Sequence, residues 1–159
     1  MLKDEVLQLE KELSFDSFSN EDAYNIALII VNRIKKDQLK NIRIRAVLDG
    51  EIVFQYLMKG KKGDIWLNRK QNTIERFHHS GYYIFLDNEE NGTYEQYKDD
   101  ETIVICGGGF PIIVKDDIVG SFIVSGLDHV EDHQLIVDAF REYKIKKSWR
   151  FHKGSIYYK

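Results

Sequence analysis

The apolar residues of the chain recur at two spacings along the sequence, one typical of helices and one typical of strands. Steps of three and four residues place apolar side chains on one face of several segments, as a helix that packs against a core requires. These segments predict helices over residues 2–13, 21–36, 65–77 and about 129–143. Residues 82–88 are expected to form a further short helix, although their pattern also fits a strand.

Alternation of apolar and polar residues predicts a β-hairpin in the first half of the chain. Its strands are residues 41–48 and 51–58, and Asp49-Gly50 forms the turn, because both central residues of a type I′ turn need positive φ. Short apolar runs predict three more strands, at residues 102–106, 111–115 and 118–125. The last two make a second hairpin over Asp116-Asp117, and Gly120 predicts a bulge or the close approach of another backbone.

The order of these elements predicts an α+β fold. Hairpins connect most of the strands, so we expect a largely antiparallel sheet with helices covering its faces. No repeat or linker divides the chain, which is therefore expected to be one domain over residues 1–159, with a helical appendage at 1–14 and a basic tail at 144–159. Residues 155–158 in this tail are a candidate edge strand.

Composition limits the expected partners and location of the protein. The chain has 23 basic and 26 acidic residues, and this balance gives no reason to expect nucleic acid or an anionic membrane as a partner. The longest apolar run, Ala27–Val31, is too short to span a bilayer, and Met1–Glu5 does not resemble a signal peptide. The single cysteine, Cys106, cannot form an internal disulfide. A cytoplasmic protein is therefore expected.

The triple glycine at residues 107–109, followed by Phe110-Pro111, is the most distinctive stretch of the sequence. It lacks the Gly-Lys-Ser/Thr ending of a phosphate loop, and strand residues follow it where such a loop needs a helix. The glycines either permit tight backbone packing or offer a flat backbone platform to a ligand or partner. The sequence leaves both interpretations open.

Side chains with catalytic or metal-binding chemistry give weak signals. His129 and His133 lie four residues apart and could face one metal ion, but no third ligand stands at a telling spacing. Cys106 is expected to be an inert thiol in an apolar strand, and Ser125 lacks a Gly-x-Ser-x-Gly motif. His78-His79 is expected to be structural, although one imidazole is enough to ligate a heme iron. No nucleophile–base pair is visible, so an enzyme is the least supported class.

Arg69, Lys70 and Asn72 form a polar cluster on the helix predicted at 65–77. One interpretation is a solvated helix face. The other is a carboxylate clamp beside the glycine turn, because the planar fork of arginine matches a carboxylate.

Three linked motifs resemble a known family. Residues 66–77 read Trp-Leu-Asn-Arg-Lys-Gln-Asn-Thr-Ile-Glu-Arg-Phe, residues 107–114 read Gly-Gly-Gly-Phe-Pro-Ile-Ile-Val, and residues 119–133 carry Val-Gly, Val-Ser-Gly-Leu and Glu-Asp-His in that order. Over roughly residues 15–143 the chain resembles the heme-degrading or heme-binding HbpS-like family, also called GlcG-like, and in particular its small stand-alone, uncharacterised branch.

The resemblance implies a profilin-like α+β fold, in which helices cover both faces of an antiparallel five-stranded sheet, and homo-oligomers from dimers upward. Some relatives bind heme and one group is described as heme-degrading. The sequence departs from the family at two places. Cys106 stands where a histidine often precedes the glycine turn, and His79-Ser80 stands where two serines are often found.

The expected function is that of an oligomeric small-ligand-binding protein, with heme or a related tetrapyrrole as candidate ligand. Its pocket is expected between the 65–77 helix and the glycine turn, where aromatic rings would contact a flat ligand and Arg69 or Lys70 would meet a carboxylate. The candidate ligand-binding residues are Trp66, Arg69, Lys70, Asn72, Ser80, Gly107, Gly108, Gly109, Phe110, Ser125, Gly126, Asp132 and His133. The alternative is a non-catalytic scaffold, in which the same motif cluster forms a subunit or partner interface.

Overall fold

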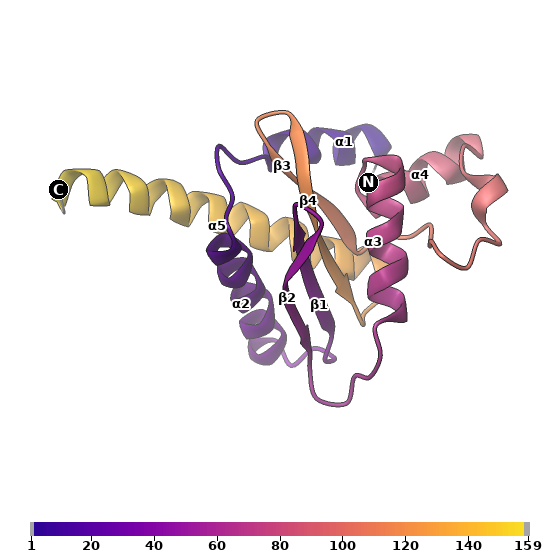
Figure 1. The fold of residues 1–159 in the computed structure, drawn as a ribbon, viewed down its shortest axis with the longest axis horizontal. Helices are drawn as coiled ribbons and strands as arrows, with labels where there is room; N and C mark the ends of the chain where they lie inside the picture. The colour runs from indigo at the N-terminus through magenta and orange to yellow at the C-terminus, as the bar shows by residue number, and fades with distance from the viewer. Residues whose placement is uncertain (1, 158–159) are drawn as a thin grey trace.

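The computed structural model describes residues 2–157, which fold into helices around one antiparallel sheet (Figure 1). The elements are α1 (Lys3–Glu12), α2 (Asn20–Lys36), β1 (Arg43–Leu48), β2 (Glu51–Leu57), α3 (Ile65–Phe77), α4 (Gly81–Asn91), the 3₁₀ turn η1 (Glu95–Tyr97), β3 (Gly109–Val114), β4 (Asp117–Ser125) and α5 (His129–Tyr157). The strand order is β2-β1-β4-β3, and every pair is antiparallel. The α+β class expected from the sequence is confirmed, and residues 82–88 are helical.

The expected five-stranded sheet is wrong for the described residues, which form four strands. Residues 102–106 run as an irregular segment because their backbone groups bond to side chains of α3. The Thr73 hydroxyl accepts the N–H of Val104 at 3.0 Å and donates to the carbonyl of the same residue at 2.8 Å. These bonds replace the ladder that a neighbouring strand would supply.

Both hairpin turns use residues with positive φ. Asp49 and Gly50 have φ of 50° and 81°, which confirms the predicted turn between β1 and β2. The second turn lies one residue earlier than expected, at Lys115 and Asp116 with φ of 50° and 44°, because β4 begins at Asp117. The predicted close approach at Gly120 is confirmed, since a Cβ there would lie 1.9 Å from the Val47 carbonyl oxygen.

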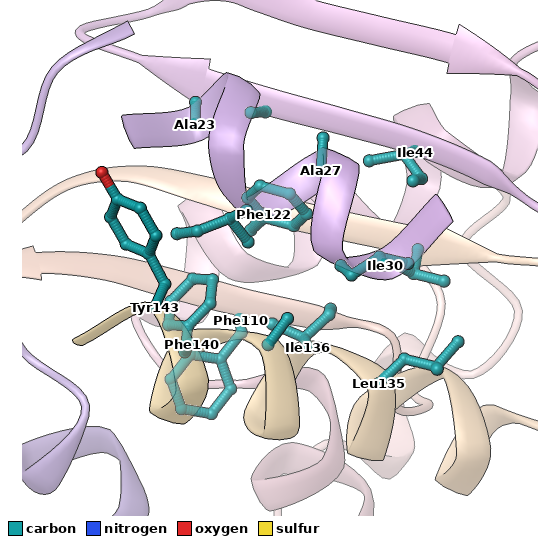
Figure 2. Close-up of a cluster of buried hydrophobic side chains, with 14 of the residues drawn as sticks. Ala23, Ala27, Ile30, Ile44, Phe110, Phe122, Leu135, Ile136, Phe140 and Tyr143 are labelled. Atoms are coloured by element: carbon teal, nitrogen blue, oxygen red, sulfur yellow. The ribbon is translucent and has the colours of Figure 1, made fainter. Parts of the chain in front are cut away.

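The main core lies between the sheet and the layer formed by α2 and α5 (Figure 2). Phe110 of β3 and Phe122 of β4 meet Phe140 of α5 edge to face, with ring centroids 5.5 and 5.7 Å from it. From α2, Ala23, Ala27 and Ile30 are among the side chains that enter this core. The aromatic rings therefore fill the space between the sheet and α5, and mainly aliphatic side chains attach α2.

The opposite face of the sheet is covered by α3 and is held mostly by polar contacts. Among residues 2–157, a small cluster of Leu67, Ile74 and Ile123 is the buried apolar cluster on this face. Beside them Arg45 of β1 is buried, and its guanidinium nitrogens donate to Gln55 at 2.7 Å and to two α3 side chains. The α3 partners of Arg45 are Asn68 at 2.7 Å and Gln71 at 2.9 Å. Helices thus cover both faces of the sheet, but different forces attach them.

The two ends of the chain are both helical. In α1, Glu10 bonds to Ser80 and lies 3.1 Å from His79, so the predicted appendage packs against the start of α4. At the other end α5 continues to Tyr157 and projects beyond the rest of the molecule (Figure 1). Residues 155–157 are helical, which contradicts the candidate edge strand there, and residues 158–159 lie outside the described residues. Among residues 2–157, no helix combines the length and apolarity needed to cross a membrane.

Candidate functional site

A pocket of about 350 Å³ lies where the start of α3, the end of β4 and the first turn of α5 meet. Its lining consists of Arg43, Lys61, Trp66, Lys70, Cys106, Ser125, Gly126, Leu127, His129 and Asp132. Five of these, Trp66, Lys70, Ser125, Gly126 and Asp132, are among the candidate residues expected from the sequence. A larger groove of about 550 Å³ between α2 and α5 contains none of the candidate residues.

A buried ion pair forms one wall of this pocket. The Lys70 ammonium of α3 lies 3.0 Å from the Asp132 carboxylate of α5, and the two side chains are only 5% and 1% exposed. Lys70 also donates to the Val124 carbonyl at 2.9 Å. Asp132 accepts the backbone N–H of Leu127 at 2.9 Å and that of Gly126 at 3.4 Å. Burial raises the pKa of Asp132, whereas Lys70 and these two N–H groups oppose that shift.

His129, the first residue of α5, is tied to the glycine turn. The backbone N–H of Gly107 donates to its Nδ1 at 2.8 Å. Burial lowers the pKa of His129, and the positive charge of Lys70 lowers it further. The imidazole is therefore favoured in its neutral form, and it remains half-buried at the pocket.

Cys106 lies just before the glycine turn and lines the same pocket. Burial raises the pKa of its thiol, an effect that the charges of Lys70 and Arg69 oppose. The thiol is thus the favoured form, as the sequence indicated, although the residue lies in an irregular segment and not in a strand.

Arg69 and Asn72 hold the 102–106 segment instead of facing the pocket. Arg69 Nε donates to the Ile103 carbonyl at 3.0 Å, and its guanidinium stacks 4.8 Å above the Trp66 ring. Asn72 donates to the Thr102 carbonyl at 2.8 Å. Of the two cations considered for a carboxylate clamp, only Lys70 lines the pocket.

The triple glycine allows the backbone to pack closely. Gly108 has φ of 117°, and a Cβ on it would lie 2.4 Å from Lys70 Nζ. A Cβ on Gly107 would lie 2.5 Å from the His129 carbonyl oxygen, and one on Gly109 would lie 2.9 Å from Ile74. All three glycines are therefore required by packing around the pocket wall.

Phe110 and His133 lie in the core behind the pocket. Phe110 is fully buried, with its ring centroid 6.0 Å from that of His133. His133 is 1% exposed, and neither of its ring nitrogens has a hydrogen-bond partner among the described residues. Burial lowers the pKa of His133 to about 4, so its ring is neutral near pH 7.

Ser80 does not line the pocket but holds the start of α4. Its hydroxyl caps α4 by accepting the Tyr83 N–H at 3.4 Å, and it bonds to Glu10 of α1 at 3.2 Å. The next residue, Gly81, packs on the Cys106 carbonyl, since a Cβ there would lie 2.1 Å from that oxygen. Ser80 therefore positions the helix that supports the segment before the glycine turn.

Sequence reasoning did not select Arg43, Lys61 and His129 as ligand-binding residues, yet all three line the pocket. Arg43 donates to the carbonyls of Lys62 and Gly63 at 2.8 and 3.0 Å, which folds the basic loop after β2 over the pocket. The excess of positive charge in that loop was the signal available in the sequence. Among the described residues, no group of three potential metal-ligating side chains comes together.

A family model described as "Haem degrading protein HbpS-like" matches residues 18–141. A UPF0303 protein of Psychromonas ingrahamii is 35% identical over 144 residues, covering 87% of this chain and 90% of that protein. A UPF0303 protein of Brucella melitensis biotype 1 is 37% identical over 145 residues, covering 87% of this chain and 85% of its own length.

Three solved structures share the fold. The Ybr137w protein superimposes with a TM-score of 0.79 at 25% identity, covering 89% of this chain and 88% of that one. HbpS gives a TM-score of 0.62 at 20% identity, with coverages of 77% and 86%. A PduOC:heme complex gives 0.64 at 15% identity, with coverages of 79% and 94%.

Proposed function

The chain belongs to the HbpS-like family of haem-degrading proteins, and from this premise we propose that it binds a small carboxylate-bearing ligand in the pocket beside Trp66. Heme or a related tetrapyrrole is the leading candidate, because one protein of the same fold was solved as a heme complex. The observation that carries the proposal is the lining itself, which combines a partly exposed indole with three cationic side chains. The pocket is assigned a binding role only.

The charges of the lining favour an anionic ligand. Asp132 is the only acidic residue of the lining, and Lys70 neutralises it through the buried ion pair. Arg43 and Lys61 then supply net positive charge at the pocket, where carboxylates of a ligand would meet them. Trp66 is 44% exposed beside these cations, and the part of its ring that the Arg69 guanidinium leaves uncovered would contact the ring of a tetrapyrrole.

Replacing Arg43 and Lys61 together by glutamine is expected to weaken tetrapyrrole binding about a hundredfold, because each of the two charge-assisted hydrogen bonds to a carboxylate contributes roughly 1.5 kcal/mol. Titration of the purified protein with hemin, followed by the Soret band, measures the change. Lys62→Gln is the matched control, since this neighbouring lysine is exposed and does not line the pocket. Equal weakening in the control, or no weakening in the double variant, would contradict the proposal.

The alternative role, a scaffold with the motif cluster at an interface, is supported by apolar side chains beside the pocket. Ile65, the first residue of α3, is 69% exposed next to Trp66. We propose that the chain forms homo-oligomers and that these side chains contribute to the contact, because exposed neighbouring apolar residues favour association. A cytoplasmic location remains part of the proposal.

Light scattering after size-exclusion chromatography tests this contact. The wild-type protein is expected to have a mass above that of the 18.7 kDa monomer, and Ile65→Glu is expected to shift it towards the monomer. Ile145→Glu is the control, because Ile145 is 66% exposed but lies on α5 away from the pocket. A monomeric wild type, or the same shift in both variants, would argue against an interface at Ile65.

A further inference from the structure

We propose that the His129 imidazole is fixed as an Nε2–H donor at the pocket. The pocket would then hold a ligand through the ligand's carboxylate groups and not through a metal ion. The inference rests on the proposed function for the location of the ligand, and it narrows the chemistry by which the ligand is recognised. Small organic carboxylates with a flat apolar body, including iron-free porphyrins, are the chemical class that it predicts.

The tautomer of His129 follows from its contact with the glycine turn. A backbone N–H can only donate, so the 2.8 Å contact from Gly107 makes Nδ1 an acceptor without a proton. A neutral imidazole carries one N–H, and that proton must then be on Nε2. Protonating both nitrogens would turn the Gly107 contact into a clash of two donors. The lowered pKa of His129 agrees with a neutral ring.

The contact that sets this tautomer is rigidly held. A Cβ on Gly107 would lie 2.5 Å from the His129 carbonyl oxygen and 3.2 Å from the His133 Cβ, so the turn packs directly on the first turns of α5. The segment before Gly107 is held in turn by Arg69, Asn72 and Thr73 of α3. The Gly107 N–H therefore cannot shift without breaking other contacts.

A histidine that ligates a metal needs the opposite arrangement. Its second ring nitrogen usually donates to a carboxylate or carbonyl oxygen, which leaves a lone pair on the nitrogen that faces the metal. In His129 the second nitrogen faces a donor, so the lone pair is used inside the protein. Nε2 therefore offers a proton to the pocket, where a carboxylate oxygen would accept it.

The other potential iron ligands at the pocket do not replace His129. Cys106 favours its protonated thiol, whereas iron takes the thiolate. Asp132 is engaged by Lys70 and by two backbone N–H groups. His133 does not line the pocket and is 1% exposed. Among the described residues, the pocket lining therefore does not fit an axially ligated heme iron. The lining does fit the carboxylate groups of a heme.

A comparison of ligands with and without iron tests the inference. In a Trp149→Phe background, Trp66 is the only tryptophan, and quenching of its fluorescence reports binding. Hemin and iron-free protoporphyrin IX are expected to bind with dissociation constants within threefold of each other. His129→Phe is expected to weaken both about tenfold, whereas His129→Gln, which keeps an N–H donor, is expected to stay within threefold of the parent.

Two results would overturn the inference while leaving the proposed function intact. One is hemin binding at least tenfold tighter than protoporphyrin. The other is a His129→Phe variant that loses hemin but not protoporphyrin. If neither compound quenches Trp66, the proposed function fails and the inference about its ligand fails with it.

The tautomer itself can be measured without any ligand. Two-bond ¹H–¹⁵N correlation spectra of the ¹⁵N-labelled protein distinguish a protonated from an unprotonated ring nitrogen, and His129→Gln identifies the signals of His129. An unprotonated Nδ1 and a protonated Nε2 are expected near pH 7. The reverse pattern would overturn the inference, whatever the titrations show.

Discussion

Lys70→Met is expected to lower the free energy of unfolding by roughly 3–5 kcal/mol, because it leaves a buried carboxylate without its cation. Asp132 is 1% exposed, and its remaining partners are two backbone N–H groups. The variant also removes the bond from Lys70 to the Val124 carbonyl. The loss should therefore come from an uncompensated buried charge and an unsatisfied acceptor, with little contribution from side-chain volume.

Urea denaturation of a double-variant cycle measures the coupling within this pair. Asp132→Asn alone should also be destabilising, because it leaves the Lys70 ammonium buried without a counter-charge. The double variant Lys70→Met/Asp132→Asn should lose clearly less than the sum of the single losses. Lys62→Met controls for removing a lysine from an exposed position. Additive losses would mean that the two side chains do not stabilise each other.

Stability is expected to fall by roughly 3 kcal/mol as the pH decreases from about 6.5 to about 4, owing to His133. In the folded chain its pKa is about 4, below the ordinary value of 6.5. Between these two values the unfolded chain binds a proton that the folded chain does not, so acid favours unfolding at up to 1.36 kcal/mol per pH unit. Below about pH 4 both states are protonated and this contribution stops changing.

Urea denaturation at a series of pH values checks this slope. His133→Leu keeps a similar volume and removes the titrating ring, so most of the slope should disappear. His129 also has a lowered pKa, which contributes a slope of the same sign. His78→Asn is the control because His78 is exposed, and asparagine tolerates its positive φ of 61°. An unchanged slope in His133→Leu would show that His133 is not the group responsible.

Local sequence patterns predicted those parts of the fold that local geometry decides. Asp49-Gly50 specified its own turn, because few residues accept two positive φ angles in succession. The 102–106 segment was predicted as a strand because Ile103, Val104 and Ile105 are apolar and β-branched. No local pattern could show that Thr73, about thirty residues earlier, would take the backbone bonds of Val104 instead of a strand.

Some of the candidate residues line the pocket. Trp66 and Asp132 were expected in it and line it, whereas the adjacent residues Arg69 and Lys70 could not be distinguished by residue type. Which of the two cations turns inward depends on where Asp132 and the Val124 carbonyl lie, and the sequence does not contain that information. The tautomer of His129 was equally hidden, because it is set by a backbone N–H twenty-two residues away.

The two faces of the sheet should not separate with equal ease. Apolar packing holds α2 and α5 to the sheet, whereas α3 is held by the bonds of Arg45 and the Lys70 pair around a small apolar cluster. Polar contacts of this kind contribute little stability once water can replace the partners. We therefore expect α3 to detach in a local opening whose free energy is lower than that of global unfolding. Because α3 carries Trp66 and Lys70, such an opening would separate these two residues from the rest of the pocket lining while the sheet and the main core stay folded.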